Sequence, residues 1–149
     1  MNNESATNAP ARQYIVEAAL VQRGLARATC REASIEFDTS VGQSDSLMGP
    51  ADLLASAFAA CVLKNVERFA QMLSFTYQTA TIQVTLERQD RPPRITSVQY
   101  TLHLVTAESP HRVDLLHRNL VKHGTIYNTL AAACPVTGSV TVELPSAVA

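Results

Sequence analysis

One long amphipathic segment, residues 51–73, constrains the fold of this 149-residue chain more than any other feature. Its apolar residues recur at spacings of three and four, which is the period of one buried helix face. They are Leu54, Phe58, Cys61, Val62, Val66, Phe69 and Leu73. Pro50 precedes the segment, and its fixed φ and missing N–H suit a first helical turn. The first half, LLASAFAACVL, is apolar nearly all round, so we expect a central helix that is buried on several sides.

Strand patterns occur on both sides of this helix. Three runs rich in β-branched and aliphatic residues predict a small antiparallel meander, and they cover residues 14–23, 25–30 and 34–38. A loop rich in Ser and Gly follows at residues 39–49. After the helix, residues 80–87 and 95–106 alternate apolar and polar side chains, which predicts an antiparallel hairpin connected by residues 88–94.

The rest of the chain predicts two helices and a final strand. Pro110 begins a helix that runs to Lys122, and Gly124 follows its end. Thr125 is the expected cap of a second helix, residues 126–134, and a last strand covers residues 139–144. The predicted order is β-β-β-α-β-β-α-α-β, an α+β fold in which antiparallel sheets surround the central helix. Residues 1–12 offer nothing to bury, so we expect a disordered segment there and a single domain over residues 13–149.

The composition excludes several classes of protein. With 12 Lys and Arg against 13 Asp and Glu, the chain lacks the basic excess of nucleic-acid-binding proteins. The longest apolar run, residues 53–63, is much shorter than the roughly 20 residues of a membrane-spanning helix. The N-terminal sequence MNNESATNAPARQ has neither the basic nor the apolar region of a secretion signal. We therefore expect a cytoplasmic protein that binds neither nucleic acid nor membranes.

Motifs for metal ions and nucleotide cofactors are missing from the sequence. No CxxC, HExxH or HxE pattern occurs, and there is no glycine-rich nucleotide loop and no GxSxG elbow. We expect neither a metal ion nor a cofactor. The four histidines are assigned to solvated surface: His103, His111, His117 and His123.

The three cysteines remain as candidates for chemistry, because a reducing compartment disfavours structural disulfides. Cys61 lies in the middle of the most apolar helix, where a free cysteine is commonly a small core residue. Cys134 closes a predicted helix, and the dipole at a helix C-terminus does not favour a thiolate. Cys30 lies in a short strand and looks incidental. Spacing alone leaves Cys61 open between a core residue and a reactive thiol.

Two motifs, in order along the chain, resemble those of the OsmC/Ohr family of thiol-dependent hydroperoxide reductases. The first is GPADLLASAFAACVLKNVERFA, and the second is TIYNTLAAACPVTGSV. In that family a proline-led helix carries one cysteine, and a second cysteine followed by Pro-Val lies far downstream. The resemblance covers nearly the whole chain, including the order of strands and helices. It implies that Cys61 is the peroxidatic cysteine and Cys134 the resolving cysteine.

The activity that the resemblance implies is the reduction of organic hydroperoxides. The Cys61 thiolate would attack the peroxide O–O bond and become a sulfenic acid, which Cys134 would convert into an intramolecular disulfide. A dithiol reductant, such as a lipoylated protein, would then reduce this disulfide by exchange. The resemblance also implies a homodimer. The apolar neighbours Leu54 and Phe58 would favour an organic hydroperoxide over hydrogen peroxide.

Members of the family supply an arginine near the end of the first strand, held by a glutamate at the start of the helix, and this cation favours the thiolate. Arg23 is the nearest match for the arginine, with Arg27 and Arg31 as rivals. The glutamate position falls on Ala51, so its carboxylate is missing.

Three polar residues of the helix lie near Cys61 in the sequence. Asp52 lies nine positions before Cys61, on the opposite side of a straight helix, and it suits the positive end of the helix dipole. Lys64 and Asn65 follow Cys61 by one turn. They are either local groups that assist a thiolate or polar positions on an interface.

Two other interpretations stay open at this point. One is a non-catalytic dimer of the same fold that binds a small apolar or electrophilic ligand, with Cys61 merely lining the pocket. The other is a redox-sensing thiol protein whose output is a contact with a partner. The first of these predicts that the protein consumes no peroxide.

Overall fold

The computed structural model describes residues 9–147, which divide into two compact units, Met1–Pro50 and Ala51–Ala149. Of the disordered segment predicted over residues 1–12, residues 1–8 lie outside the described residues. Residues 9–16 form neither helix nor strand. None of the helices within residues 9–147 is long and apolar enough to cross a membrane.

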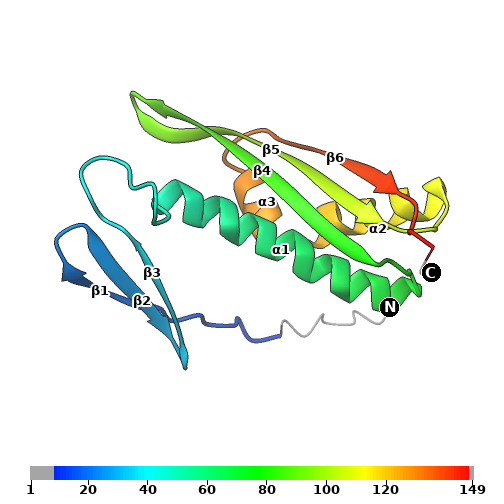
Figure 1. Cartoon of the computed structure of the whole chain (residues 1–149), viewed down its shortest axis with the longest axis horizontal. Coiled ribbons are helices and arrows are strands. Elements are labelled where there is room, and N and C mark those ends of the chain that lie inside the picture. The colour runs from blue at the N-terminus through cyan, green and yellow to red at the C-terminus, as the bar shows by residue number, and fades with distance from the viewer. Residues whose placement is uncertain (1–8, 148–149) are drawn as a thin grey trace, which may run out of the picture. The chain divides into compact units, whose positions relative to one another are not determined.

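The N-terminal unit contains a three-stranded antiparallel meander of β1 (Glu17–Gln22), β2 (Leu25–Cys30) and β3 (Ala33–Asp38), in the order β1-β2-β3 (Figure 1). The bounds of β2 confirm the prediction. The predicted strand at residues 14–23 is shorter in the structure, because Glu17 pairs with Thr29 near the end of β2 and the chain then turns at Arg31, whose φ is 56°. Gly24, with a φ of 82°, makes the turn between β1 and β2.

The meander has one apolar face and one polar face. Cross-strand register places Leu20 opposite Ala26 and Phe37, and Ala18 opposite Ala28 and Ile35. The other face carries Arg27, which forms an ion pair of 2.6 Å with Glu36. Although Ala26 is buried, Leu20 is 72% exposed and Ile35 is 50% exposed. The exposed part of the apolar face therefore includes Ala18, Leu20 and Ile35.

The loop that leads from β3 to the long helix is organised by Asp38. Its side chain is mostly buried, and its carboxylate accepts hydrogen bonds from the backbone N–H groups of Ser40 and Ser44, at 2.8 and 3.1 Å. Hydrogen bonding from Ser40 lowers the pKa of this carboxyl. The Ser- and Gly-rich composition that predicted a loop thus corresponds to a turn built around one buried acid.

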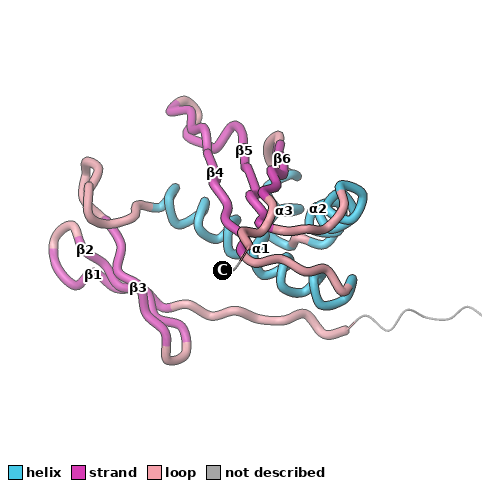
Figure 2. The backbone as a smooth tube through the Cα atoms, turned by 45° about the vertical axis from the view of Figure 1, so that its right-hand side comes forward, coloured by secondary structure: helices cyan, strands magenta, loops and turns pink. Residues whose placement is uncertain are grey.

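The C-terminal unit places three helices on one face of a three-stranded sheet (Figure 2). Its helices are α1 (Pro50–Leu73), α2 (Pro110–His123) and α3 (Thr125–Ala131), and its strands are β4 (Thr79–Asp90), β5 (Pro93–Val105) and β6 (Val136–Glu143). The sheet order is β4-β5-β6. β4 and β5 pair antiparallel as expected, whereas β6 runs parallel to β5, because the chain crosses over through two helices before it returns.

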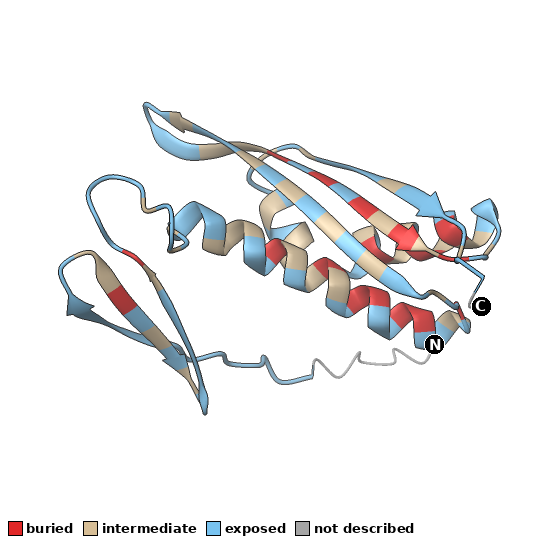
Figure 3. Ribbon diagram, in the orientation of Figure 1, coloured by how far each residue is buried: buried red, intermediate tan, exposed pale blue. Residues whose placement is uncertain are grey.

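The hydrophobic core lies between α1, the inner face of β5 and α2 (Figure 3). Its buried residues are spaced two apart on β5 and three or four apart on the helices. They include Phe58, Val62, Val66, Phe69, Val98, Tyr100, Leu102, Leu104, Val113, Leu116 and Leu120. The predicted burial of α1 on several sides is not found within one chain, since Ser56, Ala57 and Ala60 are exposed. One face of α1 meets the sheet and the other helices.

Several element boundaries differ from the predictions, among them β6, which begins at Val136 rather than residue 139. The hairpin between β4 and β5 is tighter than residues 88–94, because the ladder continues past an irregularity at Glu87 and Arg88 and pairs Asp90 with Pro93. α3 begins at Thr125 with Gly124 as its cap and no side-chain capping bond, so the capping role expected for Thr125 is wrong. α3 also ends at Ala131, so Cys134 lies after the helix rather than inside it.

Arg112 joins the end of α1 to the start of α2. Its guanidinium donates hydrogen bonds to the backbone carbonyls of Leu73 and Ser74, both at 2.9 Å, and to the carboxylate of Glu108. The two carbonyls belong to the end of α1, where backbone acceptors lack partners within the helix. The hydrogen bond from Arg112 lowers the pKa of Glu108. Both helices are thereby held at one point beside the core.

Gly138 is required by the aromatic ring on the neighbouring strand. It lies opposite Tyr100 in the β5–β6 register. A Cβ atom at position 138 would lie 2.0 Å from Cζ of Tyr100 and 2.1 Å from Cε1. No other residue type leaves room for the ring where it lies.

We expect Gly138→Ala to lower the free energy of unfolding by about 1–3 kcal/mol, as overpacking of a core does. Urea denaturation followed by circular dichroism measures this change. Gly42→Ala is the matched control, because a Cβ there meets nothing within 4 Å. The control should change the free energy by less than about 0.5 kcal/mol. Equal stability of the two variants would contradict the role given to Gly138.

Candidate functional site

Cys61 lies on α1 where the helix meets the junction of α2 and α3. Its thiol is free and half-buried. The Sγ atom would lie 3.7 Å from a Cβ placed on Gly124, the buried residue between the two helices. The same Cβ would come within 3.0 Å of the Leu120 carbonyl oxygen, so the absence of a side chain at Gly124 allows this close approach. The sequence predicts only a helix end at Gly124, so it does not reveal the close approach of Cys61 to this glycine.

A cluster of aromatic rings lies one helical turn before Cys61. Phe58, one turn before Cys61, is fully buried. Its ring centroid lies 5.4 Å from that of Tyr100 and 5.7 Å from that of Tyr127. Tyr127 lies on α3, next to Gly124. We call this cluster of Phe58, Tyr100 and Tyr127 the apolar wall, and it is built from α1, β5 and α3.

A hydrogen bond between Tyr100 and His117 closes this aromatic cluster on the side of α2. Tyr100 Oη and His117 Nε2 are 2.7 Å apart. Burial raises the pKa of Tyr100 and lowers the pKa of His117, so both rings favour their uncharged forms. The assignment of His117 to solvated surface was wrong, because the ring is half-buried. The helical spacing of Val113, Leu116 and Leu120 indicates the buried face of α2. Because His117 borders that face, this spacing could have predicted its partial burial.

Asn65 provides a polar contact to Cys61. Its Nδ2 atom donates to the Cys61 backbone carbonyl at 3.0 Å and lies 3.8 Å from Cys61 Sγ. Asn65 is only 9% exposed, whereas Lys64 is exposed. Of the two residues that the sequence left as local helpers of the thiol, Asn65 is the one in contact with it.

Cys134 lies in the turn between α3 and β6. Its backbone N–H donates to the Leu130 carbonyl at 2.9 Å, and its thiol donates to the same oxygen at 3.6 Å. The thiol is free, half-buried and packed against the core cluster. The two cysteines of the implied pair thus belong to the same compact unit, Ala51–Ala149.

The three candidate arginines all belong to the N-terminal unit, Met1–Pro50. Arg27 lies in the middle of β2 and is paired with Glu36. Arg23 and Arg31 lie in the turns at opposite ends of the meander. The turn at Arg23 adjoins the start of the loop toward α1, because Thr39 N–H donates to the Gly24 carbonyl at 3.1 Å. The three arginines therefore occupy different places in the meander, and Arg27 is the one that forms an ion pair with Glu36.

The start of α1 offers no carboxylate at the position where the family pattern has one. Ala51 occupies that position and is exposed. Asp52 lies in the first turn of α1, where a negative charge complements the helix dipole. The Ser56 hydroxyl donates to the Asp52 carbonyl at 2.8 Å.

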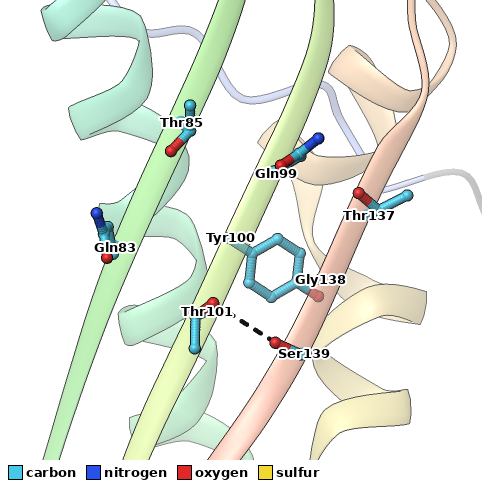
Figure 4. A pocket seen from close by; sticks show the side chains of 8 residues that line it. All are labelled: Gln83, Thr85, Gln99, Tyr100, Thr101, Thr137, Gly138 and Ser139. Carbon is cyan, nitrogen blue, oxygen red and sulfur yellow. Dashed lines mark hydrogen bonds between the residues drawn. The ribbon is translucent and has the colours of Figure 1, made fainter.

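A hollow of about 400 Å³ lies on the exposed face of the β4–β5–β6 sheet, and no cysteine lines it (Figure 4). Its lining is uncharged and mostly hydroxyl or amide: Gln83, Thr85, Gln99, Tyr100, Thr101, Thr137, Gly138 and Ser139. The hydroxyls of Thr101 and Ser139 are 3.5 Å apart. Since no thiol lines it, this hollow is not the reactive site. Within residues 9–147, no group of three or more His, Cys, Asp or Glu side chains is placed to hold a metal ion.

The OsmC-like protein family model matches residues 42–139 of this chain. Among solved structures, the OsmC-like protein from Mycoplasma pneumoniae is 20% identical, with a TM-score of 0.80 over 88% of this chain and 97% of that chain. An OsmC-like protein of unknown function from Vibrio cholerae is 10% identical, with a TM-score of 0.75 over 88% and 100%. The organic hydroperoxide resistance protein OhrB of Bacillus subtilis is 13% identical, with a TM-score of 0.65 over 86% and 98%.

At these identities the solved structures show a shared fold. The chain has no significant sequence match among curated proteins. The family model nevertheless covers well over half of the chain, including Cys61 and Cys134. The chain therefore belongs to the OsmC-like protein family.

Proposed function

We propose that this protein is a thiol-dependent peroxidase that reduces organic hydroperoxides. The observation that carries the proposal is the environment of Cys61. Its free thiol is half-buried, and it lies one helical turn after Phe58, whose ring packs against Tyr127. The Asn65 amide nitrogen lies 3.8 Å from Cys61 Sγ. An apolar wall favours the organic group of a hydroperoxide over water or hydrogen peroxide. Membership of the OsmC-like family supports the same conclusion.

The proposed cycle has three balanced steps. The Cys61 thiolate attacks the terminal oxygen of the hydroperoxide, so an S–O bond forms and the O–O bond breaks. The alkoxide takes a proton and leaves as an alcohol, and Cys61 becomes a sulfenic acid. The Cys134 thiol then displaces water from this sulfenic acid and forms a disulfide. A dithiol, such as a lipoylated protein, donates two electrons and two protons to restore both thiols.

We also propose that the protein works as a homodimer in the cytoplasm. The support for a dimer comes from the N-terminal unit, which has no core of its own among residues 9–50, where Ala26 and Asp38 are the buried residues. The apolar face of its meander exposes Leu20 and Ile35. Exposed apolar area on this scale marks a surface that another protein covers. A second copy of the chain is the occupant we propose.

One equivalent of cumene hydroperoxide should remove two thiols per chain, and peptide mass spectrometry should find Cys61 joined to Cys134. Cys61→Ser should abolish the reaction, since it removes the nucleophile. Cys134→Ser should leave a sulfenic acid at Cys61 that dimedone labels. Cys30→Ser is the matched control and should consume peroxide at the wild-type rate. Unchanged thiols in the wild-type protein would instead favour a non-catalytic ligand-binding protein.

Arg23→Ala should slow alkylation of Cys61 by iodoacetamide at pH 7, because the arginine that Arg23 matches in the family pattern favours the thiolate. Arg31→Ala, at the other end of the meander, should leave the rate unchanged. Arg27→Ala should mainly break the ion pair with Glu36. A wild-type rate for Arg23→Ala, with a slower rate in either other variant, would transfer the role to Arg27 or Arg31.

Leu20→Glu and Ile35→Glu should convert the proposed dimer into monomers, because each places a charge on the apolar face of the meander. Analytical ultracentrifugation measures the mass of the particle. Thr29→Glu is the control, since Thr29 pairs with Glu17 and Ser34 on the opposite face. The dimer proposal fails if the wild-type protein sediments as a monomer.

A further inference from the structure

A buried amide beside a thiol is unusual enough to need an explanation. Asn65 lies on the face of α1 that packs into the core, between Val62 and Val66, which are 4% and 1% exposed. A polar side chain at such a position costs free energy unless its hydrogen-bonding groups find partners. Asparagine is also a weak helix former in a helix interior. Neither burial nor helix formation therefore explains why an asparagine stands here.

The contacts of the Asn65 amide are directed at a single residue. Nδ2 carries two hydrogens, and it lies 3.0 Å from the Cys61 carbonyl oxygen and 3.8 Å from Cys61 Sγ. Residues four apart share a helix face, so this geometry follows directly from the helix. The carbonyl contact fixes the side chain, and the second contact then brings an N–H group to the sulfur.

Other groups that might serve the sulfur are placed differently. Ala51 supplies no carboxylate, and Lys64 is exposed to solvent. The Arg68 guanidinium lies over the Phe69 ring, 5.3 Å from its centroid. Among residues 51–147, the Asn65 amide is the side-chain donor within hydrogen-bonding reach of Cys61 Sγ.

We propose that Asn65 is a thiolate-stabilising residue, which donates a hydrogen bond to Cys61 Sγ and so favours the form that attacks the hydroperoxide. This rests on the proposed function, in which that thiolate is the nucleophile. A donor strengthens its bond when the acceptor becomes charged, so it favours the thiolate over the thiol. When the S–O bond forms and the O–O bond breaks, the same contact keeps the sulfur oriented toward the apolar wall.

α2 carries a matched control for this role. The Asn119 amide donates to the Leu115 carbonyl at 2.8 Å, which is the same contact four residues back along a helix. No sulfur accepts from it. Replacing Asn119 therefore removes an equivalent side-chain to backbone hydrogen bond without changing the surroundings of Cys61.

The experiment measures the rate of iodoacetamide alkylation against pH in the full-length Cys30→Ser/Cys134→Ser protein, where Cys61 is the remaining thiol. Asn65→Leu should lower the rate at pH 7 by about three- to tenfold and move the profile to higher pH, because the reactive thiolate becomes rarer. Asn65→Asp, nearly the same size as Asn65, should lower the rate further, since its carboxylate repels the thiolate. Asn119→Leu should keep the parent profile.

The shape of the profile separates stabilisation of the thiolate from a change in packing. A packing change alters the plateau rate at high pH, whereas loss of the donor moves the midpoint of the profile. The titratable or charged groups that follow Cys61 on α1 or flank Gly124 stay the same in every variant: Lys64 and Arg68 on α1, His123 at the end of α2 and Tyr127 on α3. If Asn65→Leu proves unstable, Asn65→Ala takes its place, because it also removes the amide donor and adds no charge.

Parent-like midpoints in both Asn65 variants would overturn the proposal, as would an equal shift in Asn119→Leu. The result is independent of the proposed peroxidase activity, because alkylation requires no hydroperoxide. A protein that consumes no cumene hydroperoxide but shows shifted midpoints would refute the function and leave the role of Asn65 intact. Normal peroxide consumption with unshifted midpoints would support the proposed function and refute the role of Asn65.

Discussion

The packing of α1 against the inner face of β5 is the interaction on which the rest of the C-terminal unit depends. Phe58, Val62 and Val66 present one stripe of α1, and β5 meets it with Val98, Tyr100, Leu102 and Leu104, all nearly inaccessible to solvent. This contact fixes the rotation of α1 about its own axis. Because Cys61 stands at the edge of the buried stripe, the same rotation leaves its thiol half-buried beside α3. The exposure of the thiol is thus tied to core packing.

Two glycines allow the surrounding layers to approach the core closely enough to form this site. Gly138 leaves space on β6 for the Tyr100 ring, which can then reach His117 on α2. Gly124 brings the junction of α2 and α3 against Cys61 and places Tyr127 beside Phe58. At both glycines the backbone itself lies against the neighbouring side chain, which is Tyr100 at Gly138 and Cys61 at Gly124. The apolar wall beside the thiol therefore depends on positions that carry no side chain of their own.

Features that follow from the spacing of residues along one element could be predicted from the sequence. Features that depend on contacts between residues far apart in the sequence could not. The period of three and four predicted α1 and its start at Pro50, because burial of one face imposes that period. The sequence analysis did not predict that β6 pairs parallel to β5. The two helices between these strands form a crossover connection, which favours parallel pairing. Propensity extended α3 through Ala132 and Ala133, whereas the chain turns there as Ala133 and Cys134 both donate to Leu130. The hydrogen bond from His117 to Tyr100 joins elements that only the fold brings together.

The two means of stabilising a thiolate that are proposed for this chain differ in how they are held. An arginine acts through charge, and between exposed groups its effect weakens with salt over a Debye length of about 10 Å at 0.1 M. It also needs a partner to hold it, and Ala51 supplies none at the start of α1. The Asn65 amide is uncharged and lies on the same helix as Cys61, so the helix itself keeps the donor near the sulfur. A chain that lacks the carboxylate can in this way keep a reactive cysteine, because the nearest donor needs no counter-charge to position it.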